Sequence, residues 1–215
     1  MIYNFGKHNS LFNTFLAEVR DEVVQHDRMR FRRNLERMAE VMAYELSKGL
    51  KYIPETIVTP LGEAKMNVLQ DEIVLATILR AGLPMHQGLL NYFDTADSAY
   101  VSAYRKHRTE EKYDIQVEYC AAPQIDGKIL IISDPMLATG SSMWAVYKEL
   151  LKNGNPKEVH VVSAIAAKEA IDFITKKMPT ATKIWVGAID DELTAQSYIV
   201  PGLGDAGDLA YGDKL

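Results

Sequence analysis

A run of small polar residues follows one of the most apolar segments of the chain. Residues 128–133 read Lys-Ile-Leu-Ile-Ile-Ser, and residues 134–142 read Asp-Pro-Met-Leu-Ala-Thr-Gly-Ser-Ser. We expect a buried strand to end at Asp134 and a helix to begin near Ser141. Hydroxyls and free backbone N–H groups at a helix N-terminus can bind a phosphate, and Gly140 would let the backbone approach the anion. Ordinary helix capping explains the same residues, so the local pattern leaves both interpretations open.

Two arginines follow other apolar segments. Arg80 comes directly after Ile73–Leu79, and Arg105 comes directly after the segment 98–104. In an open α/β sheet, ligands bind beyond the carboxyl ends of the strands, where Asp134 is also expected. Guanidinium groups grip phosphate with two hydrogen bonds. Each arginine alone is more simply a surface residue, but together with the loop after Asp134 they indicate a small polyanionic ligand.

A glycine-rich segment lies near the end of the chain. Residues 198–208 read Tyr-Ile-Val-Pro-Gly-Leu-Gly-Asp-Ala-Gly-Asp. Its glycines would let backbone amides and carbonyls lie close to a flat ligand. Asp205 and Asp208 could hold a hydrated divalent cation, or they could be solvated acids on a loop. Because glycine and proline are frequent from Asp190 onward, we expect no regular secondary structure there.

The composition excludes several classes of protein. With 215 residues, 47% of them hydrophobic and 25% charged, the chain suits one ordinary globular α/β domain. A net charge of −5 argues against nucleic-acid binding. The single cysteine excludes an intramolecular disulfide and a cysteine-based zinc site. There is no secretory signal and no apolar run of membrane length, so we expect a cytoplasmic protein without membrane contact.

Hydrophobic periodicity predicts the elements that position these residues. Residues 1–50 should be helical, with two apolar faces formed by Phe12, Phe15, Leu16, Val19 and Val23, and by Phe31, Leu35, Met38, Met42 and Leu46. Strands are predicted at 55–59, 65–69, 72–79, 98–104, 115–119, 128–133, 158–165 and 183–189, and further helices at 84–93, 141–151 and 167–178. Alternation of strands and helices predicts a doubly wound α/β sheet. The pair of strands around residues 60–62 predicts a hairpin arm.

Four segments together resemble one enzyme family. ILRAGL, the Tyr-Arg pair at 104–105, SDPMLATGSS and YIVPGLGDAGD are similar, in that order, to the motifs of uracil phosphoribosyltransferases, over roughly residues 10–212. The resemblance implies the type I phosphoribosyltransferase fold, a parallel sheet flanked by helices with a hood and a β-hairpin arm used in dimerisation. It implies a single domain over 1–215, with a helical part at 1–50, the arm at 55–70 and a hood and uracil-binding tail at 190–215.

The resemblance also implies the site residues. It assigns catalytic roles to Arg80, Arg105, Asp134 and Asp205. It assigns binding of 5-phosphoribosyl 1-diphosphate to Arg80, Arg105, Asp134, Pro135, Met136, Leu137, Ala138, Thr139, Gly140, Ser141, Ser142 and Asp205. It assigns uracil binding to Ile199, Gly204, Asp205 and Ala206. The expected cofactor is Mg²⁺, held mainly by the substrate and water near Asp205, with no direct protein ligand.

The implied reaction converts uracil and 5-phosphoribosyl 1-diphosphate into UMP and diphosphate. The expected partners are these two substrates, GTP as an effector, and further copies of the chain in a homodimer or homotetramer. The chain departs from the family at Ser141, where a second glycine is usual, and at residues 208–213. The segment 109–122 matches weakly and is expected to be a loop over the diphosphate.

Three alternatives remain open at this stage: a UMP-sensing RNA-binding regulator on the same fold, a phosphoribosyltransferase for another base, and a purely structural relative.

Overall fold

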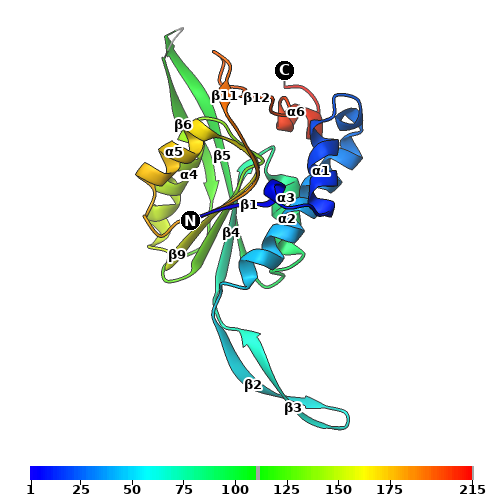
Figure 1. The fold of residues 1–215 in the computed structure, drawn as a ribbon. Coiled ribbons are helices and arrows are strands. Elements are labelled where there is room, and N and C mark those ends of the chain that lie inside the picture. Colours follow the sequence, from blue (N-terminus) through cyan, green and yellow to red (C-terminus); the bar gives the residue numbers. More distant parts are fainter. Residues whose placement is uncertain (110–111, 215) are drawn as a thin grey trace.

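The computed structural model describes the backbone of residues 1–109 and 112–214, and the side chains of these residues except 105–109 and 112–115. Figure 1 shows a central twisted sheet with helices on both of its faces. A long two-stranded hairpin extends away from this body. Of the helices in the described chain, none is both long enough and apolar enough to cross a bilayer.

The sheet confirms the predicted α/β architecture. Its strands are β1 (Ile2–Asn4), β4 (Ile73–Leu79), β5 (Asp97–Thr109), β6 (Lys112–Ala121), β7 (Ile129–Ser133), β9 (Glu158–Ala167) and β10 (Lys183–Asp190), with the short β8 (Met136–Leu137) beside β9. The order along the sheet is β1-β10-β9-β7-β4-β5-β6. Neighbouring strands are parallel except β5 and β6. The continuous apolar runs of β4 and β7 are buried because helices cover both faces.

The helices form two layers around the sheet. They are α1 (Leu11–Arg20), α2 (Arg28–Ser47), α3 (Leu83–Leu90), α4 (Ser141–Leu150), α5 (Lys168–Lys177) and α6 (Ala206–Tyr211), with 3-10 turns η1 (Phe5–Lys7), η2 (Val24–His26) and η3 (Leu151–Asn153). One hydrophobic core lies between the sheet and α1 to α3, and a second lies between the sheet and α4 and α5. The predicted apolar face of α2 is confirmed as fully buried. Val23 is exposed instead, because α1 ends at Arg20 and does not continue to it.

Three local predictions were wrong. The first fifty residues are not helical throughout, because residues 2–4 form the edge strand β1. The segment expected as a loop over the diphosphate is largely strand β6, antiparallel to β5, with residues 110–111 outside the described chain. The tail contains β11 (Glu192–Leu193), β12 (Ile199–Val200) and α6. A helix forms there because Asp205 Oδ1 accepts hydrogen bonds from Gly207 N and Asp208 N, which caps it.

The hairpin arm consists of β2 (Tyr52–Thr59) and β3 (Gly62–Leu69) in antiparallel register. Most of its residues are exposed, including Val58 and Leu61. A two-stranded hairpin has no core of its own and is marginally stable in isolation. The arm therefore presents apolar surface that the described residues of its own chain leave exposed.

Candidate active site

Two of the predicted site residues follow strands that end at one edge of the sheet, whereas Arg105, expected just after a strand, lies inside β5 because this strand continues to Thr109. Arg80 follows β4, and Asp134 follows β7. These two strands are adjacent and parallel, with Thr77 paired to Ser133. Gly82, two residues after Arg80, packs against the end of β7, because a Cβ at this glycine would lie 3.1 Å from Ser133 O. The backbone segments that carry Arg80 and Asp134 are therefore neighbours.

Residues 134–142 connect β7 to α4 and enclose a small hollow. The hollow measures about 60 Å³ and is lined by Asp134, Met136, Leu137, Ala138, Thr139, Gly140, Ser142 and Met143. The loop is fixed at its centre, where β8 pairs with β9, and at its end, where Thr139 Oγ1 accepts a hydrogen bond from Ser141 N at 3.3 Å. The N-terminus of α4 faces this region, and the N–H groups of a first helical turn have no partner within the helix. Such a loop suits one phosphate group.

Gly140 has a different structural role from the one expected. It caps α4 with φ +77°, in the left-handed region. A Cβ at this position would come within 3.1 Å of Phe173 and 3.2 Å of Ala170 O, both on α5. The glycine is therefore required by the backbone turn and by close packing against α5, and not only by the approach of an anion.

Asp134 is a partly buried carboxyl at the start of the loop. Its Oδ1 accepts a hydrogen bond from Met136 N at 3.3 Å. Burial raises the pKa of Asp134 to about 7, and the bond from Met136 offsets only part of this shift. A carboxyl that ionises near neutrality can both accept hydrogen bonds from hydroxyl groups and donate one.

Arg80 connects the sheet edge to the C-terminal tail. Its Nη2 donates to Asp208 Oδ1 at 2.9 Å and to Gly212 O at 3.1 Å. Its Nε is buried and has no hydrogen-bond partner among the described atoms. An unpaired buried donor is costly, so this nitrogen is suited to receive an anionic ligand. For Arg105 only the backbone is described: it lies in β5 opposite Ile115, and its side chain falls outside the described set.

The tail residues predicted to bind a base lie between β12 and α6. Ile199 is buried in β12, and Ala206 is buried at the start of α6. Gly204 lies between them with φ +91°, a conformation that favours glycine. Asp205 caps α6 through its Oδ1. The tail is therefore an ordered turn whose backbone groups have fixed directions.

Asp205 and Asp208, which could hold a hydrated cation, each have one carboxylate oxygen engaged within the chain. Asp208 is engaged by Arg80, which takes one of its oxygens. Among the residues that the structure describes, no cluster of three or more His, Cys, Asp or Glu side chains could hold a metal ion. Mg²⁺ usually keeps several waters and binds one or two carboxylates together with substrate phosphates. Asp205 has its Oδ1 in the helix cap, and its other oxygen suits that arrangement, so the residues present fit a cation carried by a phosphorylated substrate.

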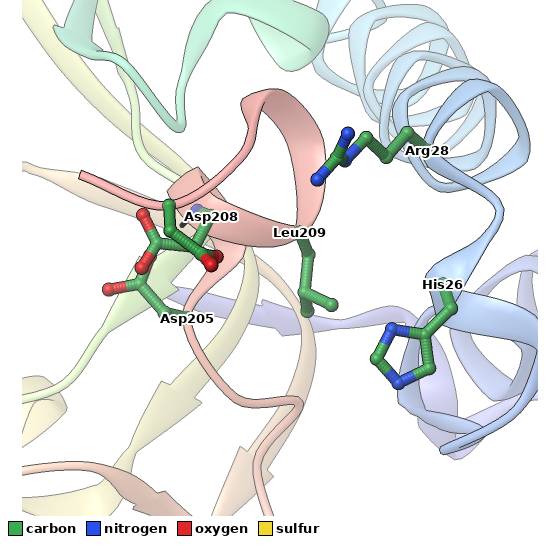
Figure 2. Close-up of a pocket in the computed structure, with 6 residues that line it drawn as sticks. His26, Arg28, Asp205, Asp208 and Leu209 are labelled. Carbon is green, nitrogen blue, oxygen red and sulfur yellow. Dashed lines mark hydrogen bonds between the residues drawn. The ribbon is translucent and has the colours of Figure 1, made fainter. Parts of the chain in front are cut away.

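A larger cleft lies beside the tail. Its volume is about 340 Å³, and it is lined by His26, Arg28, Asp205, Asp208, Leu209 and Asp213. Figure 2 shows His26 and Arg28 on one side, Asp205 and Asp208 on the other, and Leu209 pointing into the gap. The residues that line the cleft are all different from those that line the hollow of the loop after β7, and they include both acidic and basic side chains.

One ion pair in this region was not anticipated from the sequence. Arg20, the last residue of α1, binds Asp190, the last residue of β10. Asp190 follows the same rule that selected Asp134, because it is an acid at the carboxyl end of a buried parallel strand. The position of Asp190 at the end of an apolar segment could therefore have indicated a functional acid, whereas the residues around Arg20 do not indicate its partner.

Comparison with known proteins gives consistent results. The family model described as uracil phosphoribosyltransferase matches residues 7–213. A uracil phosphoribosyltransferase of Porphyromonas gingivalis is 58% identical over 214 residues, covering 100% of this chain and 99% of that protein. The enzyme of the same name from Methanococcus vannielii is 37% identical over 217 residues, covering 100% and 91%. The solved AQ2163 protein of Aquifex aeolicus superposes with a TM-score of 0.88 at 32% identity, covering 99% and 98%.

Proposed function

The chain belongs to the uracil phosphoribosyltransferase family, and we propose that its sheet edge and tail transfer the phosphoribosyl group of 5-phosphoribosyl 1-diphosphate to uracil. The products are UMP and diphosphate, and the enzyme is a pentosyltransferase. The observation that carries the residue assignments is the convergence at one edge of a phosphate-sized loop, the partly unpaired Arg80 and an ordered glycine turn.

The loop of residues 134–142 binds the ribose 5-phosphate part of the substrate. Its hollow and the first-turn N–H groups of α4 receive the 5′-phosphate. Asp134, at the start of the loop, holds the ribose hydroxyls. Its pKa of about 7 leaves the carboxyl able to serve as acceptor or donor to those hydroxyls near neutral pH.

Arg80 and Arg105 bind the diphosphate. The bond from C1′ to the diphosphate oxygen breaks as uracil N1 releases its proton to water and forms a bond to C1′, so negative charge grows on the leaving group. A fixed guanidinium stabilises that charge without reorganising. The buried Nε of Arg80 would gain a partner from the diphosphate. When bound, Mg²⁺ would neutralise further charge on the diphosphate near Asp205.

The tail recognises uracil through its backbone. Ile199, Gly204 and Ala206 supply N–H and C=O groups, and Asp205 lies between the base and the sugar-diphosphate. Backbone groups cannot exchange donor and acceptor roles, unlike a hydroxyl or a flipping amide. The rigid turn around Gly204 supports this assignment, because its left-handed backbone fixes those directions.

We further propose that one domain spans residues 1–215, that the protein is cytoplasmic, that GTP is an effector, and that the arm pairs two copies of the chain. The exposed Val58 and Leu61 of the arm support the pairing, because contact with a second copy would bury them. Sedimentation of the full chain and of a Leu61→Asp variant tests it. A variant that sediments like the unmodified chain contradicts a role of the arm tip in assembly.

The decisive experiment incubates the protein with uracil and labelled 5-phosphoribosyl 1-diphosphate in the presence of Mg²⁺. We expect labelled UMP. Parallel incubations with hypoxanthine, orotate and cytosine test whether another base is the substrate. Turnover of one of these bases in place of uracil would contradict the proposed uracil site. It would not contradict the assignments of the diphosphate and 5′-phosphate sites, which do not depend on the base.

A further inference from the structure

A buried ion pair holds the turn that leads into the tail. Arg20 donates from Nη1 to Asp190 Oδ2 at 2.9 Å and from Nη2 to Asp190 Oδ1 at 2.8 Å. The Asp190 side chain is 8% exposed and that of Arg20 is 20% exposed. This bidentate geometry is the strongest form of an arginine–carboxylate ion pair. The pair joins the end of α1 to the end of β10.

The same two side chains bind both backbone groups of Gly202. Asp190 Oδ2 accepts a hydrogen bond from Gly202 N at 3.1 Å, and Arg20 Nη1 donates to Gly202 O at 3.0 Å. Gly202 is buried and has φ +61°, so its turn is already restricted to glycine. Ile199 lies three residues before this turn, and Gly204 lies two residues after it. The ion pair therefore holds the backbone at Gly202, between two parts of the proposed uracil site.

The side chain of Gln25 binds Leu203, the residue after Gly202. With its amide oriented as its hydrogen bonds require, Gln25 donates to Leu203 O at 2.8 Å and to Val19 O at 3.1 Å. Gln25 belongs to η2, just beyond α1. Consecutive tail carbonyls, at Gly202 and Leu203, are thus bound by one corner of the N-terminal helical part. β12 is only two residues long, so its own pairing with β11 fixes little.

We propose that Arg20 and Asp190 are positioning residues for uracil: they set the direction of the tail backbone groups that read the base. This inference rests on the proposed function, because it takes the tail as the uracil site. Among the described residues, the hydrogen bonds of these two side chains reach neither the proposed phosphate loop nor Arg80. The pair should therefore affect the binding of uracil much more than that of 5-phosphoribosyl 1-diphosphate.

The test uses three variants and one control in the full chain. Asp190→Asn keeps an oxygen that can accept from Gly202 N but removes the charge that Arg20 binds. Arg20→Ala leaves a buried carboxylate unpaired, which can unfold a protein, so Arg20→Lys is compared with it as the conservative variant. Arg30→Ala is the control, because Arg30 forms a more exposed pair with Glu18 on the helical surface.

We expect Asp190→Asn to raise KM for uracil by about tenfold or more, while KM for 5-phosphoribosyl 1-diphosphate stays within about twofold. Arg20→Lys should recover part of the loss seen in Arg20→Ala, and Arg30→Ala should match the unmodified protein. Without substrates, amide hydrogen exchange at residues 199–204 should become at least about tenfold faster in Asp190→Asn.

An equal rise in both KM values, an unchanged KM for uracil, or unchanged exchange in the tail would each overturn the inference. The unmodified protein tests the proposed function separately. If it makes no UMP, the proposed function is wrong. The exchange experiment, which needs no substrate, still shows whether the ion pair of Arg20 and Asp190 holds the tail.

Discussion

Replacing Arg80 with alanine should reduce catalysis far more than stability. The side chain makes two visible contacts, with Asp208 and with Gly212 O. The Arg80–Asp208 pair is 37% and 32% exposed, and ion pairs with that exposure contribute about 0–1 kcal/mol to folding. Removing Arg80 should therefore lower the free energy of unfolding by no more than about 1 kcal/mol.

The catalytic loss is larger because Arg80 is proposed to face the departing diphosphate. Removing one preorganised donor from developing charge costs about 2–4 kcal/mol of transition-state stabilisation. That range corresponds to a decrease in kcat/KM of roughly 30- to 900-fold. Asp208→Asn removes the charged partner of Arg80 but leaves the guanidinium in place. This variant should therefore change kcat/KM by less than about tenfold.

The assay measures UMP formation at varied 5-phosphoribosyl 1-diphosphate, with urea unfolding of each variant in parallel. Arg30→Ala is the matched control, since Arg30 is an exposed arginine of α2 that is paired with Glu18 at 3.1 Å. If Arg80→Ala and Arg30→Ala lose similar activity, the arginine contributes only to a diffuse positive field. If Asp208→Asn loses as much activity as Arg80→Ala, the ion pair matters and the proposed diphosphate contact does not.

Three further predictions concern the base, the phosphate loop and pH. Uracil and 5-fluorouracil should turn over, whereas cytosine, which reverses a donor and an acceptor, should be rejected by on the order of 10⁴-fold; cytosine within about tenfold of uracil refutes backbone recognition. Gly140→Val should weaken binding of 5-phosphoribosyl 1-diphosphate and also lower stability, by about 1–3 kcal/mol, because its Cβ meets α5; calorimetry and urea unfolding measure the two effects, and unchanged affinity would contradict the loop assignment. Burial raises the pKa of Asp134 to about 7, so its ionisation opposes folding: stability is highest below the ordinary pKa of 3.8 and falls as pH rises towards 7. Asp134→Asn should remove this loss, up to about 4 kcal/mol at pH 8, while lowering activity, and an unchanged pH dependence of unfolding would show that the carboxyl is not desolvated.

Much of the fold follows from local patterns in the sequence. The apolar runs of β4 and β7 indicate strands buried on both faces, and the change to a helical period after Gly140 indicates α4. Because parallel strands share one carboxyl edge, the grouping of Arg80 with Asp134 also follows from the sequence. These features depend on residues that are close together in the chain.

What the sequence could not predict depends on distant pairs. Arg20 and Gly202 are 182 residues apart, and Arg80 and Asp208 are 128 residues apart. Neither contact leaves a periodic signal. Composition was also misleading for α6, because frequent glycine argues against a helix while the side chain of Asp205 supplies the cap that starts one. Side-chain partners across the fold, and not the identity of the elements, were the missing information.

These distant pairs share one consequence for the tail. Besides the contacts of Arg20 and Arg80, Arg32 of α2 donates to Ala210 O at 2.7 Å. Three arginines from three separate elements thus bind backbone or acidic groups of residues 202–212. Two of them, Arg20 and Arg32, come from the N-terminal helical part, and these bonds of theirs do not involve the proposed phosphate loop. The third is the proposed diphosphate ligand itself. A diphosphate that draws Arg80 away from Asp208 and Gly212 would loosen one of the three attachments, while Arg20 still binds Gly202 O and Arg32 still binds Ala210 O. We therefore expect the proposed uracil site to remain formed even when the contact between the tail and Arg80 is broken.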